Sequence, residues 1–390
     1  MFCRNNVQQI SITDPLLNMP KYLQEILEKS WAYPFQQYIF PNINEDRFEV
    51  LYSDNHASRP NSPVNVIIGL LMLKEIFNHT DDELIGSLHF DMRYQYALRT
   101  TSYDKQPVSI NTLYNFRNRL YEYEKATGID LIQQEVEEQA KLIAKYLKVN
   151  NKKVRMDSLM ISSSCKKLSR IELIYSVNAK FVKLLNKVSA DSIPEECRAY
   201  LEKGHKNDTI YRTRDQEAES KLEFLLKQSQ VLYKSGLEAG MIVTNTEEFQ
   251  LLSRLLEEQL TKDDSGKEIP KPGSDISSES LQNPTDPDAT YRKKYGDNIG
   301  YVANVAEAIN DENSVIINYD LKPNTYSDSK SADDVIEKLA QDSCTDGDRI
   351  QVLVDGAYYE QEKAEEASSK GIDLIPGELV GRKPAEDKLS

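Results

Sequence analysis

The stretch VRMDSLMI, residues 154–161, sets one carboxylate, Asp157, inside an otherwise apolar run that follows Asn-Asn-Lys-Lys. We expect this run to form a strand with one face in the core. A carboxylate on a half-buried strand costs desolvation free energy unless it is paired, hydrogen-bonded or bound to a metal. The position of Asp157 therefore needs an explanation.

The chain on the C-terminal side of this strand predicts an α/β layer. Apolar residues at three- and four-residue spacing predict a helical insertion over residues 163–261, and the Pro-, Ser-, Gly- and Asp-rich residues 262–289 predict a flexible linker. Strand and helix patterns then alternate. The expected elements are a hairpin of strands 300–309 and 314–321, a helix 331–341, a strand 349–359, a helix 360–371 and a strand 372–376. This order implies helices over a mixed sheet.

The chain on the N-terminal side reads as helical from residue 20 to 125, and a connecting helix is expected over 126–153. Thr80 and Glu83 have the spacing of a capping box, and Ser109 is a candidate cap for a further helix. The face of that helix opposite its apolar side carries Arg117 and Arg119 with two asparagines. Such a face can read DNA, as in a helix-turn-helix protein, or can simply be exposed to solvent.

Composition excludes some classes of protein. There is no apolar run of the roughly 20 residues that span a membrane, and the four cysteines and four histidines have no zinc-ligand spacing, so a cytoplasmic protein without membrane contact is expected. The net charge of −15 argues against a protein that coats nucleic acid. Residues 141–212 nevertheless hold 16 Lys and Arg against 7 Asp and Glu. This basic block is either a solvated helical surface or a DNA contact.

A second aspartate, Asp355, follows the apolar run Ile350–Val354 and precedes Gly356. If its strand lies beside that of Asp157, two carboxylates meet at one edge of the sheet and repel each other unless a cation intervenes. Mg²⁺ (or Mn²⁺) suits such a pair, and two such ions can support phosphoryl transfer. The alternative is that Asp157 pairs with Arg155 or Lys153 and that Asp355 only starts a turn.

Five segments together carry a family resemblance. They are SRPNSPVNVIIGLLMLKEIFNHTDDELIGSLHFDMRYQYALR, PVSINTLYNFRNRL, VRMDSLMISSSCKKLSR, DATYRKKYGDNIGYVANVAEA and IQVLVDGAYY. In this order and spacing the chain resembles bacterial insertion-sequence transposases with a DDE core, of the group with the N-terminal helical InsH-like transposase domain.

The resemblance implies a helical DNA-binding domain over residues 1–125 and a ribonuclease-H-like α/β core over 154–390. It implies that Asp157 and Asp355 are the first two catalytic metal ligands. It also implies that Lys166, Lys167 and Arg170 lie near the DNA backbone, where affinity would depend on salt. From the pattern of charges, Lys152 and Lys153 of the basic block and Arg117 and Arg119 of the third helix are further candidate DNA contacts.

The chain departs from the family at its C-terminus. The family's catalytic Glu follows the strand that corresponds to residues 372–376, but neither Glu360 nor Glu378 matches it, so the third carboxylate is unknown. The sequence resembles a transposase that lacks its C-terminal part.

Three functions follow as hypotheses. The first is a transposase that binds double-stranded DNA at transposon ends and target, hydrolyses phosphodiesters and transfers strands, as a homo-oligomer in the bacterial nucleoid. The second is an inactive DNA-binding remnant that inhibits a full-length transposase through a mixed complex. The third is a helical scaffold with an unrelated α/β domain.

Overall fold

The computed structural model describes residues 1–5, 14–55, 57, 59–103, 105–150, 152–211, 217–293, 296–342, 349–356 and 358–377. The chain divides into two compact units, unit 1 (Met1–Asn150) and unit 2 (Asn151–Ser390). The boundary expected at residue 125 falls inside a helix, and unit 1 also contains the helix that was expected as a connection. Among the described residues, no helix combines the length and the apolar character needed to cross a membrane.

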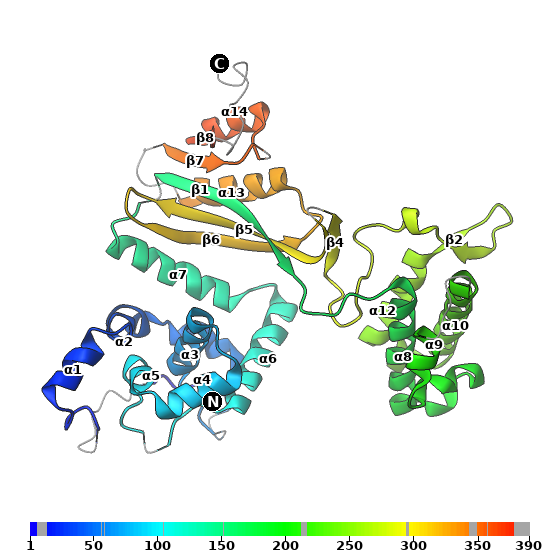
Figure 1. Ribbon diagram of the computed structural model, residues 1–390, viewed down its shortest axis with the longest axis horizontal. Helices are drawn as coiled ribbons and strands as arrows, with labels where there is room; N and C mark the ends of the chain where they lie inside the picture. Colours follow the sequence, from blue (N-terminus) through cyan, green and yellow to red (C-terminus); the bar gives the residue numbers. More distant parts are fainter. Residues whose placement is uncertain are drawn as a thin grey trace. The chain divides into compact units, whose positions relative to one another are not determined.

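Unit 1 is helical, as the sequence predicts (Figure 1). Its helices are α1 (Lys21–Glu28), α2 (Ala32–Pro34), α3 (Val64–Phe77), α4 (Asp81–Phe90), α5 (Met92–Ala97), α6 (Ile110–Thr127) and α7 (Leu131–Tyr146), with short π and 3₁₀ turns at Phe35–Ile39, Phe40–Asn42 and Glu45–Leu51. Helix α3 is buried on most sides, since Val66, Leu70 and Leu73 are fully enclosed. It is therefore the centre of the core of unit 1.

Side-chain caps define where α4 and α6 begin. Thr80 and Glu83 form a reciprocal capping box at the start of α4, which confirms the spacing argument. Ser109 caps α6, and Thr112 returns the hydrogen bond to the Ser109 backbone. Both caps satisfy backbone N–H groups that a helix start otherwise leaves without partners.

Unit 2 contains a mixed sheet. Its strands are β1 (Lys153–Ser162), β4 (Thr290–Lys293), β5 (Asp297–Ile309), β6 (Ser314–Pro323), β7 (Ile350–Val354) and β8 (Ile372–Pro376). The order across the sheet is β6-β5-β1-β7-β8, and β4 pairs with the first residues of β5. Strands β5 and β6 run antiparallel to their neighbours, whereas β1, β7 and β8 are parallel. The fold is thus mixed helix and sheet, as expected.

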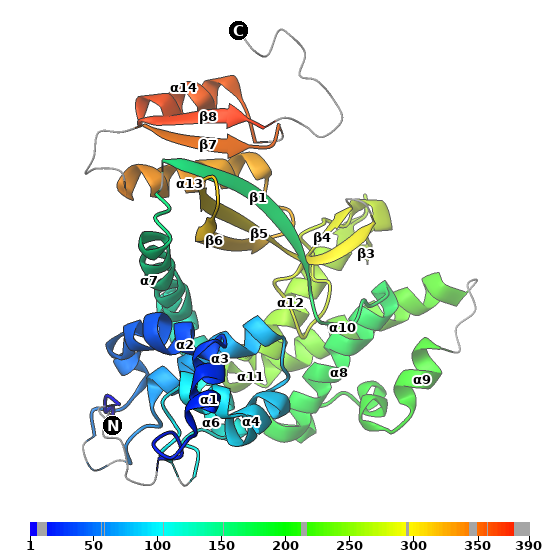
Figure 2. The same cartoon turned by 60° about the vertical axis from the view of Figure 1, so that its left-hand side comes forward.

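One face of this sheet is covered and the other is open. Helices α13 (Asp328–Asp342) and α14 (Gln361–Ser369) pack with Val154, Met156 and Val352 in one core (Figures 1 and 2). Because side chains alternate along a strand, the residues between these point to the opposite face. On β1 they are exposed, and they include Arg155 and Asp157.

The segment between β1 and β5 is mainly helical and has its own core. Its helices are α8 (Arg170–Val188), α9 (His205–Ile210), α10 (Ala218–Glu238), α11 (Met241–Thr244) and α12 (Glu247–Gln259), with 3₁₀ turns at Ala190–Ser192, Glu195–Leu201 and Gly273–Asp275. Helix α8 supplies the fully buried Phe181 and packs on α10 and α12. The predicted helical insertion therefore packs around a core of its own, although it lies between two strands of the sheet in the chain.

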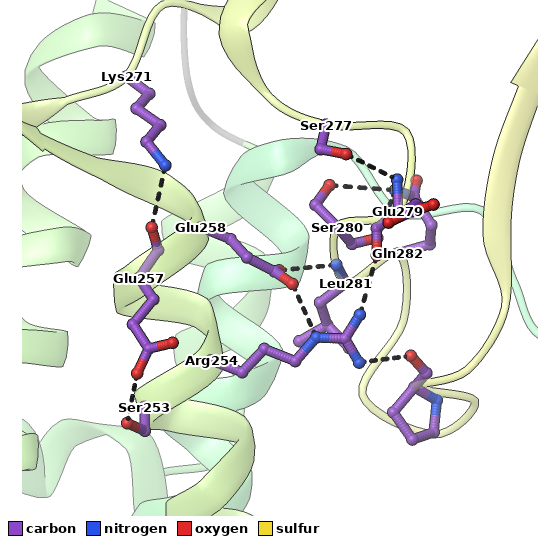
Figure 3. Close-up of polar contacts among 11 residues, drawn as sticks. Ser253, Arg254, Glu257, Glu258, Lys271, Ser277, Glu279, Ser280, Leu281 and Gln282 are labelled. Atoms are coloured by element: carbon purple, nitrogen blue, oxygen red, sulfur yellow. Dashed lines mark hydrogen bonds and ion pairs between the residues drawn. The ribbon is translucent and has the colours of Figure 1, made fainter. Parts of the chain in front are cut away.

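Residues 262–289 differ from the flexible linker that their composition predicts. They contribute to a small hairpin of β2 (Leu260–Lys262) and β3 (Glu268–Pro270). The guanidinium of Arg254 on α12 donates to the carbonyl oxygens of Glu279 and Pro287, and Glu258 accepts from the backbone N–H of Leu281 (Figure 3). Two side chains of α12 thus hold the segment in place, which its loop-forming composition did not reveal.

Candidate functional site

Asp157 and Asp355 lie at the same level of neighbouring strands. Strands β1 and β7 are parallel and pair Lys153 with Gln351 and Arg155 with Leu353. Continued by two residues, this register sets Asp355 level with Asp157. Adjacent strands are about 5 Å apart, and alternation directs both side chains to the open face. Both residues are exposed.

Neither aspartate has a cationic partner among the described residues. The carboxylate of Asp157 accepts the backbone N–H of Ser158 at 2.8 Å, and that of Asp355 accepts the N–H of Gly356 at 2.5 Å. The guanidinium of Arg155 is paired across the strands with Glu307 instead. Asp157 is therefore exposed rather than half-buried, because it alternates with the core-facing Met156, and it does not form the expected alternative pair with Arg155.

Two further polar side chains stand near the aspartate pair. Tyr358 is 2% exposed, and the side chain of Ser158 lies beside its hydroxyl. Its pKa is raised to about 12, first by burial and then by the negative charges of Asp328, Asp157 and Asp355. Oδ1 of Asp328 is buried without a hydrogen-bond partner in the described structure, and its Oδ2 lies 3.7 Å from Arg292.

Neither Tyr358 nor Asp328 was predicted from the sequence as part of the site. The helix was expected to begin at Ser331, but α13 begins at Asp328. Tyr358 is placed by a turn in which its backbone N–H donates to the carbonyl oxygen of Asp355 at 2.9 Å. That turn was read as the end of a longer strand. The Asp-Gly pair at residues 355–356 was the signal that could have located it.

The side chains present suit a hard divalent cation. All the donors are oxygens, and Mg²⁺ is commonly held by one or two carboxylates together with waters and substrate phosphates. No cluster of three or more potential metal-binding side chains occurs among the described residues. Glu360 is engaged elsewhere, since its carboxylate accepts from the hydroxyl of Ser329 at 2.9 Å. Glu378 lies outside the described residues.

The two arginines of α6 have different surroundings. The guanidinium of Arg117 forms a two-pronged contact with Asp81, at 2.7 and 2.9 Å. This contact holds the pKa of Asp81 below its usual range. Arg119 lies over the ring of Tyr52, 5.0 Å from its centroid, and its side chain is exposed. Of the two, Arg119 is the one presented to solvent without an ion pair.

The basic residues predicted in unit 2 are partly engaged in its own structure. Lys166 pairs with Glu172 at 3.0 Å, and Lys167 donates to the carbonyl oxygen of Asp297. Arg170 is bound to the side chain of Gln259 and to two carbonyl oxygens.

Two further basic residues of the block lie at the start of the sheet. Lys152 and Lys153 are both exposed, directly before the buried Val154 of β1. Lys153 projects from the same face of β1 as Asp157, because the two are four residues apart. The block predicted from the sequence therefore contains both structural cations and solvent-facing ones.

Comparison with known proteins concerns unit 1. Residues 25–119 match the family model described as Transposase domain (DUF772). A search of curated proteins and a search of solved structures each found no match. The matched segment runs from α1 to Arg119 of α6. Residues 25–119 thus resemble a transposase domain, and this match supports a transposase family for the chain.

Proposed function

We propose that the chain acts as a DNA transposase of the DDE class, with Asp157 and Asp355 as metal-binding residues on a ribonuclease-H-like sheet. Unit 1 would bind transposon-end DNA, and the open face of the sheet would hold the phosphodiester that reacts. The proposal joins the transposase-domain match in unit 1 to the aspartate pair in unit 2.

The observation that carries the proposal is the position of the two aspartates. They are almost 200 residues apart in the chain, and both are exposed without a basic partner in the described structure; extending the register of β1 and β7 by two residues would make them neighbours. Like charges so arranged repel each other in the absence of a cation. The proposal is also supported by the mixed sheet of unit 2, whose order β6-β5-β1-β7-β8 has two antiparallel pairings followed by two parallel ones.

Mg²⁺ or Mn²⁺ bound by these carboxylates would activate a water or a 3′-hydroxyl and stabilise the leaving oxygen of the phosphodiester. The protein's own part is to hold the two carboxylates on rigid strands. The backbone N–H groups of Ser158 and Gly356 orient the carboxylates of Asp157 and Asp355, and Tyr358 is buried in the core of the unit. Lys153 would attract the DNA backbone to the same face.

A second candidate is a DNA-binding form without catalytic activity. It is favoured by the engagement of Glu360 with Ser329 and by the lack, among the described residues, of a group of three or more side chains placed to hold a metal ion. Such a protein would occupy transposon ends and compete with an active enzyme.

The test is metal-dependent nicking of labelled duplex DNA that carries the ends of the element. Nicking by the wild-type chain with Mn²⁺, lost in Asp157→Asn and in Asp355→Asn but kept in the exposed-turn control Asp311→Asn, is the expected result. Nicking that survives both substitutions would refute the assignment of the metal ligands. DNA binding without nicking would support the second candidate.

A further inference from the structure

Unit 1 contains an open groove of about 1110 Å³. It is lined by the first turns of α6, the end of the Glu45–Leu51 turn, and the segments before α3 and α6. Pockets for small molecules usually have volumes of about 300–1,000 Å³ and mainly apolar walls. This groove is larger, and polar side chains alternate with its apolar residues, which favours an extended polar ligand.

The charges along the groove have one sign. Arg59, Lys105 and Arg119 line it, and no Asp or Glu is among its described lining residues. This contrasts with unit 1 as a whole, where residues 1–150 hold 19 Asp and Glu against 15 Lys and Arg. A cationic groove in an acidic unit concentrates positive potential where an anion can reach it.

These cations also lack the partners that other basic residues of unit 1 have. Arg4 pairs with Asp46, Arg93 with Asp91 and Arg117 with Asp81. In the described part of the chain, neither Arg59 nor Lys105 has a carboxylate partner, and both are exposed. Their charges are therefore available to a ligand.

Arg119 is pre-positioned for such a ligand. Its guanidinium lies 5.0 Å from the centroid of the Tyr52 ring and also contacts the Tyr52 hydroxyl, and these contacts limit its motion while the side chain stays exposed. The N-terminal half of α6 supplies Asn115 and Thr112 on the same wall. The positive end of the helix dipole lies at Ser109, which also lines the groove.

We propose that this groove binds the sugar-phosphate backbone of duplex DNA, with Arg59, Lys105 and Arg119 on successive phosphates. The inference rests on the proposed function and narrows it. In unit 1, the side of α6 that lines the groove contacts DNA. Arg117, the other arginine of α6, has a structural role in the ion pair with Asp81. Phosphate contacts of this kind fix position along the duplex and carry no direct sequence information.

The experiment measures binding of the full-length chain to a labelled duplex by fluorescence anisotropy, in EDTA and over a range of salt concentrations. The groove variant is Arg59→Gln/Lys105→Gln/Arg119→Gln. The matched control is Lys21→Gln/Lys29→Gln/Lys145→Gln, which removes the same charge from exposed lysines of unit 1 outside the groove. Circular dichroism checks that both variants fold.

We expect the slope of log affinity against log salt to become shallower by about 2.7 in the groove variant, since each lost phosphate contact removes about 0.9. Affinity should fall at least about tenfold, and the control should keep the slope of the wild type. Equal slopes in the groove variant and the control would overturn the groove assignment and leave the proposed function standing.

Two other outcomes would bear on the proposed function and on the ligand of the groove. A wild-type chain that binds no duplex would refute the proposed function itself. If, in addition, inorganic phosphate at constant ionic strength raises the melting temperature of the wild type and not of the groove variant, the groove is a site for small phosphates. That result would overturn DNA as its occupant.

Discussion

The open face of the sheet in unit 2 and the groove of unit 1 both collect like charges without counter-ions. On the sheet, Asp157 lies on β1, and Asp355 directly follows β7, the strand that pairs with β1. In the groove, three basic residues line one hollow. By contrast, other charged residues of the chain form ion pairs, as Arg117 does with Asp81. Unpaired clusters of opposite sign in the two units suit different ligands, a divalent cation and a polyanion.

The largest expected effect concerns the cation. Mn²⁺ at a hundred times its dissociation constant should raise the free energy of unfolding by about 2.7 kcal/mol, because it binds only the folded chain. Asp157→Asn should remove this gain, and Asp311→Asn, an exposed carboxylate in the β5–β6 turn, should keep it. Chemical denaturation with and without Mn²⁺ measures both. A gain that persists in Asp157→Asn would place the metal elsewhere.

The next effect distinguishes the two arginines of α6. Arg117→Met should lower the free energy of unfolding by about 1 kcal/mol, at the upper end for a two-pronged pair that is partly exposed. Arg119→Met should change it by less than about 0.5 kcal/mol. Urea denaturation of each variant tests this difference, and equal losses would contradict the structural role of Arg117.

This difference should depend on pH. The pKa of Asp81 is lowered chiefly by its hydrogen bonds with Arg117. A lowered pKa in the folded state adds stability above the unfolded pKa and loses it as the pH falls through the folded value. The destabilisation by Arg117→Met should therefore shrink below about pH 4, the usual range for Asp.

A smaller effect tests the repulsion between the aspartates. In EDTA, Asp355→Asn should raise the free energy of unfolding by about 0.5 kcal/mol, because like charges at facing positions of adjacent strands are destabilising. With Mn²⁺ present the order should reverse, since the wild type gains more from the metal. If Asp355→Asn is the less stable form in both conditions, the two carboxylates are not close enough to repel each other.

The smallest effect at neutral pH concerns Tyr358. Tyr358→Phe should alter the free energy of unfolding by no more than about 0.5 kcal/mol at pH 7, the lower end for a single hydrogen bond, because the substitution removes only the contact of the hydroxyl with Ser158. The pKa of Tyr358 is raised to about 12, so the folded state keeps its proton above pH 10 and resists ionisation. The wild type should then lose stability relative to Tyr358→Phe as the pH rises beyond 10. Thermal denaturation of both proteins over a range of pH measures this difference in stability. Equal changes in the stability of the two proteins above pH 10 would mean that Tyr358 is accessible to solvent.

Local patterns predicted much of the fold. The capping residues Thr80 and Ser109, the hairpin of β5 and β6, and the apolar run of β1 are all signals within a few neighbouring residues, and all appear in the structure. Segment 262–289 was predicted poorly, because its order depends on contacts made by Arg254 and Glu258 of another helix.

The candidate site shows the same limit. Asp157 and Asp355 were found from their place at the ends of apolar runs, and their adjacency required the pairing of β1 with β7. Asp328 was missed because the start of its helix was set three residues late. The separate roles of Arg117 and Arg119 were invisible in the sequence, since only the fold brings Asp81 to one and Tyr52 to the other.

The helical insertion between β1 and β5 has a consequence for the order in which unit 2 forms. Val154 pairs with Ala308, so the central hydrogen bonds of the sheet join residues more than 150 positions apart. Closing so long a loop has an entropic cost that slows folding. The insertion contains mainly short-range helical contacts and a core of its own. We expect it to collapse first and bring the ends of β1 and β5 together, so that the aspartate pair is among the last features of the protein to assemble.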